Sequence, residues 1–124
     1  MKKAMLAAAD SVESIMAEAV LQHLGFKIIR AKNGTEAAIR ANIESLALIL
    51  MEAGMCGRDG KPTIAALRAN SKTKAIPTLA IAEKNSAPLS EQEYRALGYD
   101  GWVIKPVSVA QVRKLIEPRQ TSES

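Results

Sequence analysis

Short apolar runs alternate with segments of helical character along the whole chain. Runs rich in Ala, Leu, Ile, Val and Met, typical of buried strands, occupy residues 4–9, 26–31, 46–51, 78–82 and 101–104. The segments that follow them, near residues 11–24, 35–42, 61–70, 90–98 and 108–116, have helical spacing or helix-forming composition. Strands alternating with helices predict an α/β fold, a doubly wound parallel sheet covered by helices on both faces.

Local signals mark where several of these elements begin and end. Asp10 or Ser11 can cap the first helix, and Gly25 ends it. The pairs Ser90/Glu93 and Ser108/Gln111 have the spacing of a capping box. A polar loop is predicted over residues 83–89. On the first helix, an apolar stripe is expected to face the core: Val12, Ile15, Met16, Ala19, Val20 and Leu24.

The composition narrows the range of functions. The length of 124 residues fits one domain. No apolar run approaches the ~20 residues that span a bilayer, so no membrane association is expected. The 17 Lys and Arg residues behind the net charge of +4 are scattered and aromatics make up 3%, which disfavours nucleic-acid binding. The single cysteine, Cys56, excludes an internal disulfide and suits a reducing, cytoplasmic location.

Four segments are predicted to meet at one edge of the sheet, because ligands of such folds bind at the carboxyl ends of the strands. They are Ala9–Asp10, Met51–Glu52, Ala82–Glu83 and Ile104–Lys105. Asp10, Glu52 and Lys105 bring two carboxylates and an ammonium group to this edge. These groups could hold a hard cation such as Mg²⁺, or they could neutralise one another in a structural salt bridge. Both interpretations remain open at this point.

Other catalytic chemistry has little support in the sequence. There is no glycine-rich phosphate-binding loop, and no Ser-His-Asp or Cys-His arrangement is indicated. His23 lies on the first helix, away from the predicted site, and Cys56 lies in a glycine-rich loop. We therefore predict that the protein is not an enzyme.

Four motifs in order resemble the receiver domain of response regulators, the CheY-like superfamily. They are Leu6–Ser11, Leu48–Glu52 with Gly57–Gly60, Ile76–Ala82 and Gly98–Pro106. The resemblance covers roughly residues 3–117. It implies a flavodoxin-like (βα)5 fold whose five parallel strands have the order 2-1-3-4-5. It also implies a receiver domain over residues 1–117 and a flexible tail over residues 118–124.

The same resemblance assigns roles to residues, and the sequence departs from the family at most of them. Glu52 stands at the phosphoacceptor position, where the family has aspartate. The acidic pair is reduced to Asp10, since Ala9 stands at its first position, and the hydroxyl switch position is Ala82. Lys105 matches the family's lysine, and Trp102 stands at the aromatic switch position. No cofactor is expected, and Mg²⁺ held by Asp10 and Glu52 would bind weakly.

These departures predict an atypical, stand-alone receiver, that is, a pseudo-receiver. We expect it to act in phosphorelay-type signalling through protein–protein contacts, without being phosphorylated. The expected contact face covers Ser90–Glu117, and its partner would be a histidine kinase or another signalling protein. The alternative is a conventional receiver phosphorylated on Glu52 or on a nearby acid such as Asp59. An enzyme or small-ligand binder on the same fold and a nucleic-acid binder are the remaining rivals.

Overall fold

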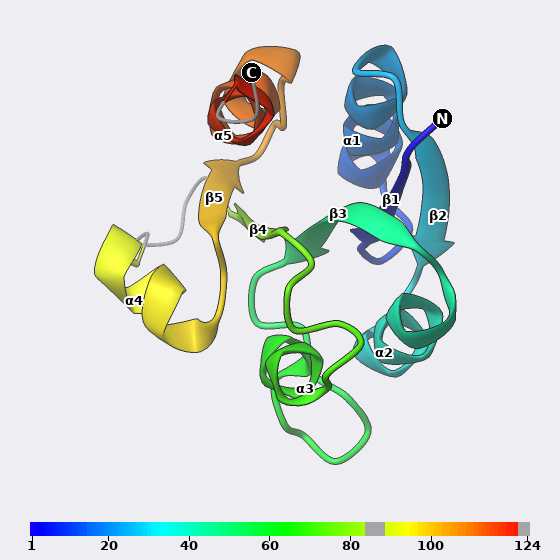
Figure 1. The fold of residues 1–124 in the computed structure, drawn as a ribbon, viewed down its shortest axis with the longest axis vertical. Helices are drawn as coiled ribbons and strands as arrows, with labels where there is room; N and C mark the ends of the chain where they lie inside the picture. Colours follow the sequence, from blue (N-terminus) through cyan, green and yellow to red (C-terminus); the bar gives the residue numbers. More distant parts are fainter. Residues whose placement is uncertain (84–88, 122–124) are drawn as a thin grey trace.

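The protein is a three-layered α/β sandwich in the computed structural model, which describes residues 1–83 and 89–121, and side-chain surroundings as far as residue 116. Strands and helices alternate as predicted: β1 Lys3–Ala7, α1 Val12–His23, β2 Lys27–Ala31, α2 Gly34–Ile43, β3 Leu46–Glu52, α3 Thr63–Ala69, β4 Thr78–Ala82, α4 Glu91–Leu97, β5 Gly101–Ile104 and α5 Val109–Thr121. Helices α1 and α5 cover one face of the sheet, and α2, α3 and α4 cover the other (Figure 1).

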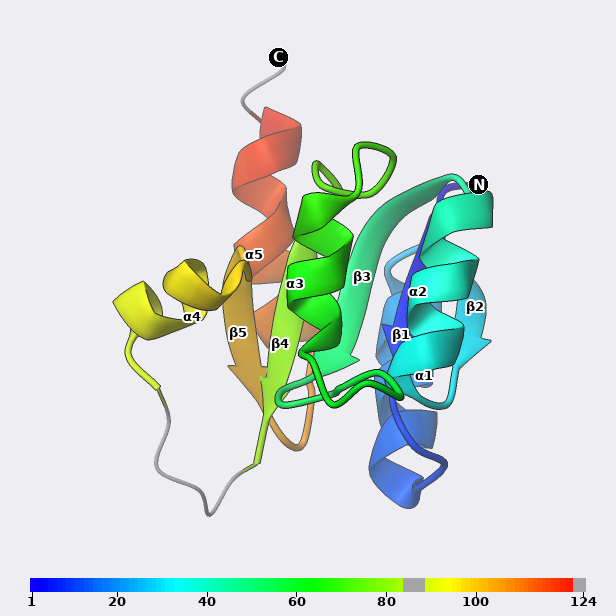
Figure 2. The same cartoon turned by 90° about the horizontal axis from the view of Figure 1, so that it is seen from below.

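The five strands of the described chain are all parallel, in the order β2-β1-β3-β4-β5. This confirms the predicted flavodoxin-like topology. Ala7 pairs with Met51, and Glu52 pairs with Ile81. The carboxyl ends of the central strands are therefore nearly level, so the residues that follow them meet at one edge, where the arrowheads end in Figure 2.

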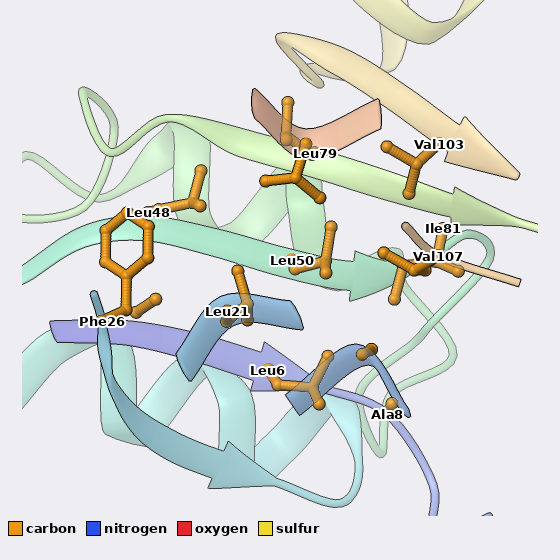
Figure 3. Packing of buried hydrophobic residues seen from close by; sticks show 13 residues of the cluster. Leu6, Ala8, Leu21, Phe26, Leu48, Leu50, Leu79, Ile81, Val103 and Val107 are labelled. Atoms are coloured by element: carbon orange, nitrogen blue, oxygen red, sulfur yellow. The ribbon is translucent and has the colours of Figure 1, made fainter. Parts of the chain in front are cut away.

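The sheet separates two apolar cores, because successive side chains of a strand point to opposite faces. Leu6 and Leu50 point toward α1 and α5, where they join Leu21 and other buried residues (Figure 3). Their neighbours Met5 and Ile49 are also fully buried but belong to the core beneath α2, α3 and α4. Strands buried on both faces are why the sequence shows continuous apolar runs rather than alternation.

The predicted apolar stripe of α1 is wrong in part. Val12 and Ile15 are 70% and 67% exposed, and Met16 is 44% exposed. The face of α1 that is buried carries Ser14, Ala17 and Leu21 instead. Small side chains at the first two of these positions allow the first turns of the helix to lie close to the sheet. The prediction holds for Val20 and Leu24, which are partly buried and pack against the core, but not for the exposed residues of the first two turns.

The predicted helix caps are mostly confirmed. Ser11 accepts a hydrogen bond from the Ser14 N–H, and Ser90 and Glu93 form the predicted capping box. The Ser108 hydroxyl accepts from the Gln111 N–H at 3.2 Å, whereas the Gln111 side-chain oxygen accepts from Ile104 at 2.8 Å.

The carboxyl-terminal boundary differs from the prediction. Helix α5 continues to Thr121 instead of giving way to a tail after residue 117. Pro118 lacks one backbone donor but does not end the helix. Of the predicted polar loop and tail, residues 84–88 and 122–124 lie outside the described residues. No helix in the described part of the chain is both long and apolar enough to cross a membrane.

Candidate functional site

The candidate site lies at the carboxyl ends of four strands, as the sequence predicted. Glu52 is the last residue of β3, Glu83 directly follows β4, and Lys105 directly follows β5. Ala9 lies two residues beyond the end of β1. The parallel register of the sheet brings these four residues together although they are far apart in the sequence.

Glu52 is bound through both of its carboxylate oxygens. The Ala9 N–H donates to Oε1 at 2.7 Å, and the Lys105 ammonium donates to Oε2 at 3.5 Å. The side chains of Glu52 and Lys105 are 27% and 16% exposed, so this ion pair is largely shielded from water. Lys105 also donates to Glu83 Oε1 at 2.8 Å, but the Glu83 side chain is 64% exposed. The salt-bridge interpretation of the sequence is therefore confirmed for Glu52 and Lys105.

The surroundings of Lys105 favour its charged form. Its hydrogen bond to Glu83 and the negative charges of Glu52 and Glu83 raise the pKa of Lys105 above its ordinary value, although burial acts in the opposite direction. The ammonium group is thus fully charged at neutral pH. Because the pKa is raised in the folded state, this contribution to stability is complete below the ordinary value of 10.5 and is lost as the pH rises through the folded-state pKa.

The predicted acidic pocket of Asp10 and Glu52 is not formed. The Asp10 carboxylate contacts Arg30 at 3.3 Å and Lys32 at 3.5 Å, and its side chain is 69% exposed. The reason lies in the turn after β1, where the Ala9 N–H is the group that reaches Glu52. Asp10 follows Ala9 and lies instead beside the cations contributed by β2 and the turn after it.

The residues present do not fit a magnesium ion. Within the described part of the chain, no group of three or more His, Cys, Asp or Glu side chains is arranged to hold a metal. Glu52 and Glu83 are both engaged by the Lys105 ammonium group, whose positive charge opposes a cation at the same place. Mg²⁺ requires several well-placed oxygen ligands, and Asp10 does not supply one here.

The two switch-equivalent positions lie on β4 and β5. Ala82 is 4% exposed and carries no hydroxyl group that could bind a phosphoryl oxygen. Trp102 is half-buried and stacks on Tyr94 of α4, with ring centroids 5.6 Å apart and an interplanar angle of 22°. Tyr94 in turn meets Tyr99 edge to face at 6.2 Å. Burial raises the pKa of Tyr99 to about 12, so this hydroxyl stays neutral.

A hollow of about 430 Å³ lies beside Trp102, between α4, β5 and α5. Its apolar lining includes Trp102, Ile104 and Leu115. Charged side chains also line it, among them the ion-paired Glu91 and Arg95 and, from α5, Lys114. This surface coincides with the contact face predicted over residues 90–117.

Two sets of contacts were not predicted from the sequence. Glu83 was placed at the correct edge of the sheet, but its role as the nearer carboxylate partner of Lys105 was not predicted. Arg68 of α3 donates to the carbonyls of Lys74, Ile76 and Gly98 and to the Asp100 carboxylate. Nothing local in the sequence distinguishes Arg68 from an ordinary exposed helix residue.

Comparisons with known proteins agree with this fold. No protein-family model matches the sequence, and no curated protein matches it closely enough to count as a relative. Among solved structures, a response regulator from Desulfuromonas acetoxidans is similar over 98% of both chains, with a TM-score of 0.82 and 24% identity. The chemotaxis response regulator CheY4 of Vibrio cholerae has a TM-score of 0.72 and 27% identity, again over 98% of both chains.

A third similar structure is the receiver domain of a sensor histidine kinase from Pseudomonas aeruginosa, which holds a magnesium ion in its active-site cleft. It has a TM-score of 0.77 and 23% identity and covers 94% of this chain and 95% of its own. The fold of this chain is therefore that of CheY-like response-regulator receiver domains, to which it is similar over nearly its whole length.

The Glu52–Lys105 pair is expected to be energetically coupled. In a double-mutant cycle with Glu52→Gln and Lys105→Met, urea unfolding should give a coupling free energy of about 1 kcal/mol, because the pair is largely shielded from water. The exposed pair Glu91 and Arg95 is a matched control and should give about 0.3–0.5 kcal/mol. The coupling of the first pair should disappear when the pH exceeds the raised pKa of Lys105. Additive single losses at neutral pH would contradict it.

Proposed function

We propose that this receiver domain signals through protein–protein contacts without being phosphorylated. The observation that carries this proposal is the environment of Glu52, at the position where the resemblance assigns the phosphoacceptor. Both of its carboxylate oxygens already accept hydrogen bonds, one from Ala9 and one from Lys105. The Glu52 carboxylate therefore fills the site itself. It is bound to Lys105, the residue that would otherwise face a phosphoryl group.

Phosphoryl transfer demands accurate placement, which supports the proposal. A misplacement of about 1 Å can cost about a hundredfold in rate. The extra methylene of Glu52 displaces its carboxylate relative to aspartate, and Asp10 is turned toward Arg30 rather than toward a metal. Charge neutralisation by a metal is a main source of catalysis in this reaction. Ala82 offers no hydroxyl hydrogen bond to the product.

Incubation with acetyl phosphate and Mg²⁺ is expected to leave the intact mass of the protein unchanged. The combined variant Ala9→Asp, Glu52→Asp and Ala82→Thr restores the family pattern beside Lys105 and is the matched control in which labelling is expected to return. Mass spectrometry of both proteins decides the question. A hydroxylamine-sensitive phosphoryl group on native Glu52 would overturn the proposal, and label that disappears with Asp59→Asn would instead favour the conventional alternative at Asp59.

The contact surface that we propose is the α4–β5–α5 face around Trp102. A half-buried aromatic residue beside a partly apolar hollow with charged residues at its edge has the features of an interface hot spot. A histidine kinase or another signalling protein is the class of partner that this proposal names. The contacts that hold Glu52 would keep this face in one conformation. That conformation matters because a partner responds only to the population of the state that it binds.

Trp102→Ala is expected to weaken partner binding about tenfold or more, the size of an interface hot-spot loss. Affinity capture from native cell extract, quantified for the native protein and the variant, measures the loss. Val12→Ala is the matched control, because Val12 is 70% exposed on α1, which is not part of the α4–β5–α5 face. Equal capture by Trp102→Ala and the native protein would move the contact surface elsewhere.

A further inference from the structure

Helices α2 and α3 enclose a second hollow that the proposed function does not use. The two helices lie side by side over the same face of the sheet (Figure 2), and the hollow between them has a volume of about 590 Å³. A hydrogen bond of 3.0 Å from Asn70 to Asn42 links the carboxyl-terminal ends of the two helices. The loop of residues 57–62 lies at the other end of the hollow. We call this hollow the α2–α3 groove.

The walls of the groove between the two helices are mainly apolar. On α3 its lining consists mainly of alanine, namely Ala65, Ala66 and Ala69. On α2, Ile39 forms its wall and is 58% exposed. Ile43, one turn further along α2, is 68% exposed, so the apolar surface extends beyond the groove itself. Exposed apolar side chains gathered along a hollow are a feature of interaction sites.

The loop end of the groove carries excess positive charge. Arg58 and Lys61 are exposed, and within the described residues no ion pair engages either side chain. Asp59 stands between them, and its carboxylate accepts a hydrogen bond from the Lys61 N–H at 3.0 Å. Two cations and one carboxylate leave a net charge of +1 at this end. An occupant with acidic groups here would find complementary charge.

We propose that the α2–α3 groove binds an amphipathic α-helix of a partner protein, with acidic residues of that helix facing Arg58 and Lys61. An extended segment would need hydrogen-bond partners for its backbone, which an apolar groove does not supply, whereas a helix satisfies its own backbone groups. The alanine side chains of α3 let a helix approach to the ~8–10 Å axial distance of ordinary helix packing. A helix also covers Ile43, which a small molecule confined to the hollow leaves exposed.

A titration followed by protein NMR tests this binding mode directly. The probes are two short synthetic helical peptides with the same leucine stripe, one with glutamates and one with lysines at the end that meets the loop. The glutamate peptide is expected to cause saturable shifts confined to α2, α3 and residues 57–62 and to bind about tenfold tighter than the lysine peptide. The double variant Arg58→Glu/Lys61→Glu should reverse this preference. Differences in peptide helicity cancel, because both proteins meet the same two peptides.

Three further variants locate the binding. Ala66→Glu and Ile39→Glu place a charge in the groove at exposed positions and should each abolish binding of the glutamate peptide. Ile15→Glu, at an exposed apolar position of α1, should leave it unchanged. Trp102→Ala should also leave it unchanged, which separates this proposal from the proposed function. Shifts elsewhere on the protein, equal affinities for the two peptides, or peptide-free self-association through the groove would overturn the proposal.

Discussion

Arg68→Ala is expected to lower the free energy of unfolding by about 3 kcal/mol, because its side chain is only 22% exposed and its charge is hydrogen-bonded to several acceptors. The Arg68 guanidinium donates to Gly98 at 2.7 Å, to Ile76 at 2.9 Å and to Lys74 at 3.1 Å through their carbonyl oxygens. It also donates to the Asp100 carboxylate at 2.9 Å. The variant leaves these acceptors without the donor they share. Urea unfolding of the native protein and the variant measures the loss.

The effect should depend on the shape of the guanidinium group as well as on its charge. Arg68→Lys is expected to recover little of the lost stability, because an ammonium group cannot reproduce the planar fork that serves several acceptors at once. Arg95→Ala is the matched control. Its side chain is 63% exposed and, within the described residues, forms one ion pair, with Glu91, so its loss should stay below about 0.5 kcal/mol. Equal losses for Arg68→Ala and Arg95→Ala would contradict this account.

The same arginine has a consequence for the proposed contact face. Gly98 and Asp100 lie in the segment between α4 and β5, and Arg68 holds that segment against α3. Trp102 follows two residues later. We therefore expect Arg68→Ala to change the fluorescence of Trp102 in the folded protein, as well as its stability.

Gly34→Ala is expected to lower the free energy of unfolding by about 2 kcal/mol, as overpacking in a tight core does. At an exposed helical position, the same change would stabilise a protein by roughly 1 kcal/mol. Here, a Cβ atom on Gly34 would overlap the Thr63 hydroxyl and the Cys56 carbonyl group. Thr63 is 2% exposed, so it has little room to move away. Thermal or urea unfolding measures the difference.

Two variants make this second prediction specific. Gly57→Ala is the matched control, because a Cβ atom there would meet its nearest neighbour, the Asp59 carboxylate, only at 3.4 Å. Its effect should be close to zero. Adding Thr63→Ala to Gly34→Ala should cost less than the sum of the two single losses, since one of the two overlaps disappears. A neutral or stabilising Gly34→Ala would show that α2 and α3 can separate more easily than the packing indicates.

The sequence by itself determined the order of the strands and helices. It also determined most of the turns and helix caps where they begin and end. Apolar runs of strand length, turn residues and caps are local features, because each depends on neighbours within a few positions along the chain. Alternation of strands and helices then leaves few topologies, and the resemblance to receiver domains selected the observed one. For the same reason, Glu52 and Lys105 could be placed at one edge of the sheet from the sequence alone.

Only the tertiary structure decided which groups contact one another at that edge of the sheet. Asp10 turned to Arg30, Glu83 joined Lys105, and Ala9 contributed its N–H to Glu52. Each of these choices depends on the turn taken after a strand and on charges brought from distant segments. The buried face of α1 was decided in the same way. A helical period shows which residues share a face, but the partner surface determines which face is buried, and here it buried Ser14, Ala17 and Leu21 rather than Val12, Ile15 and Met16.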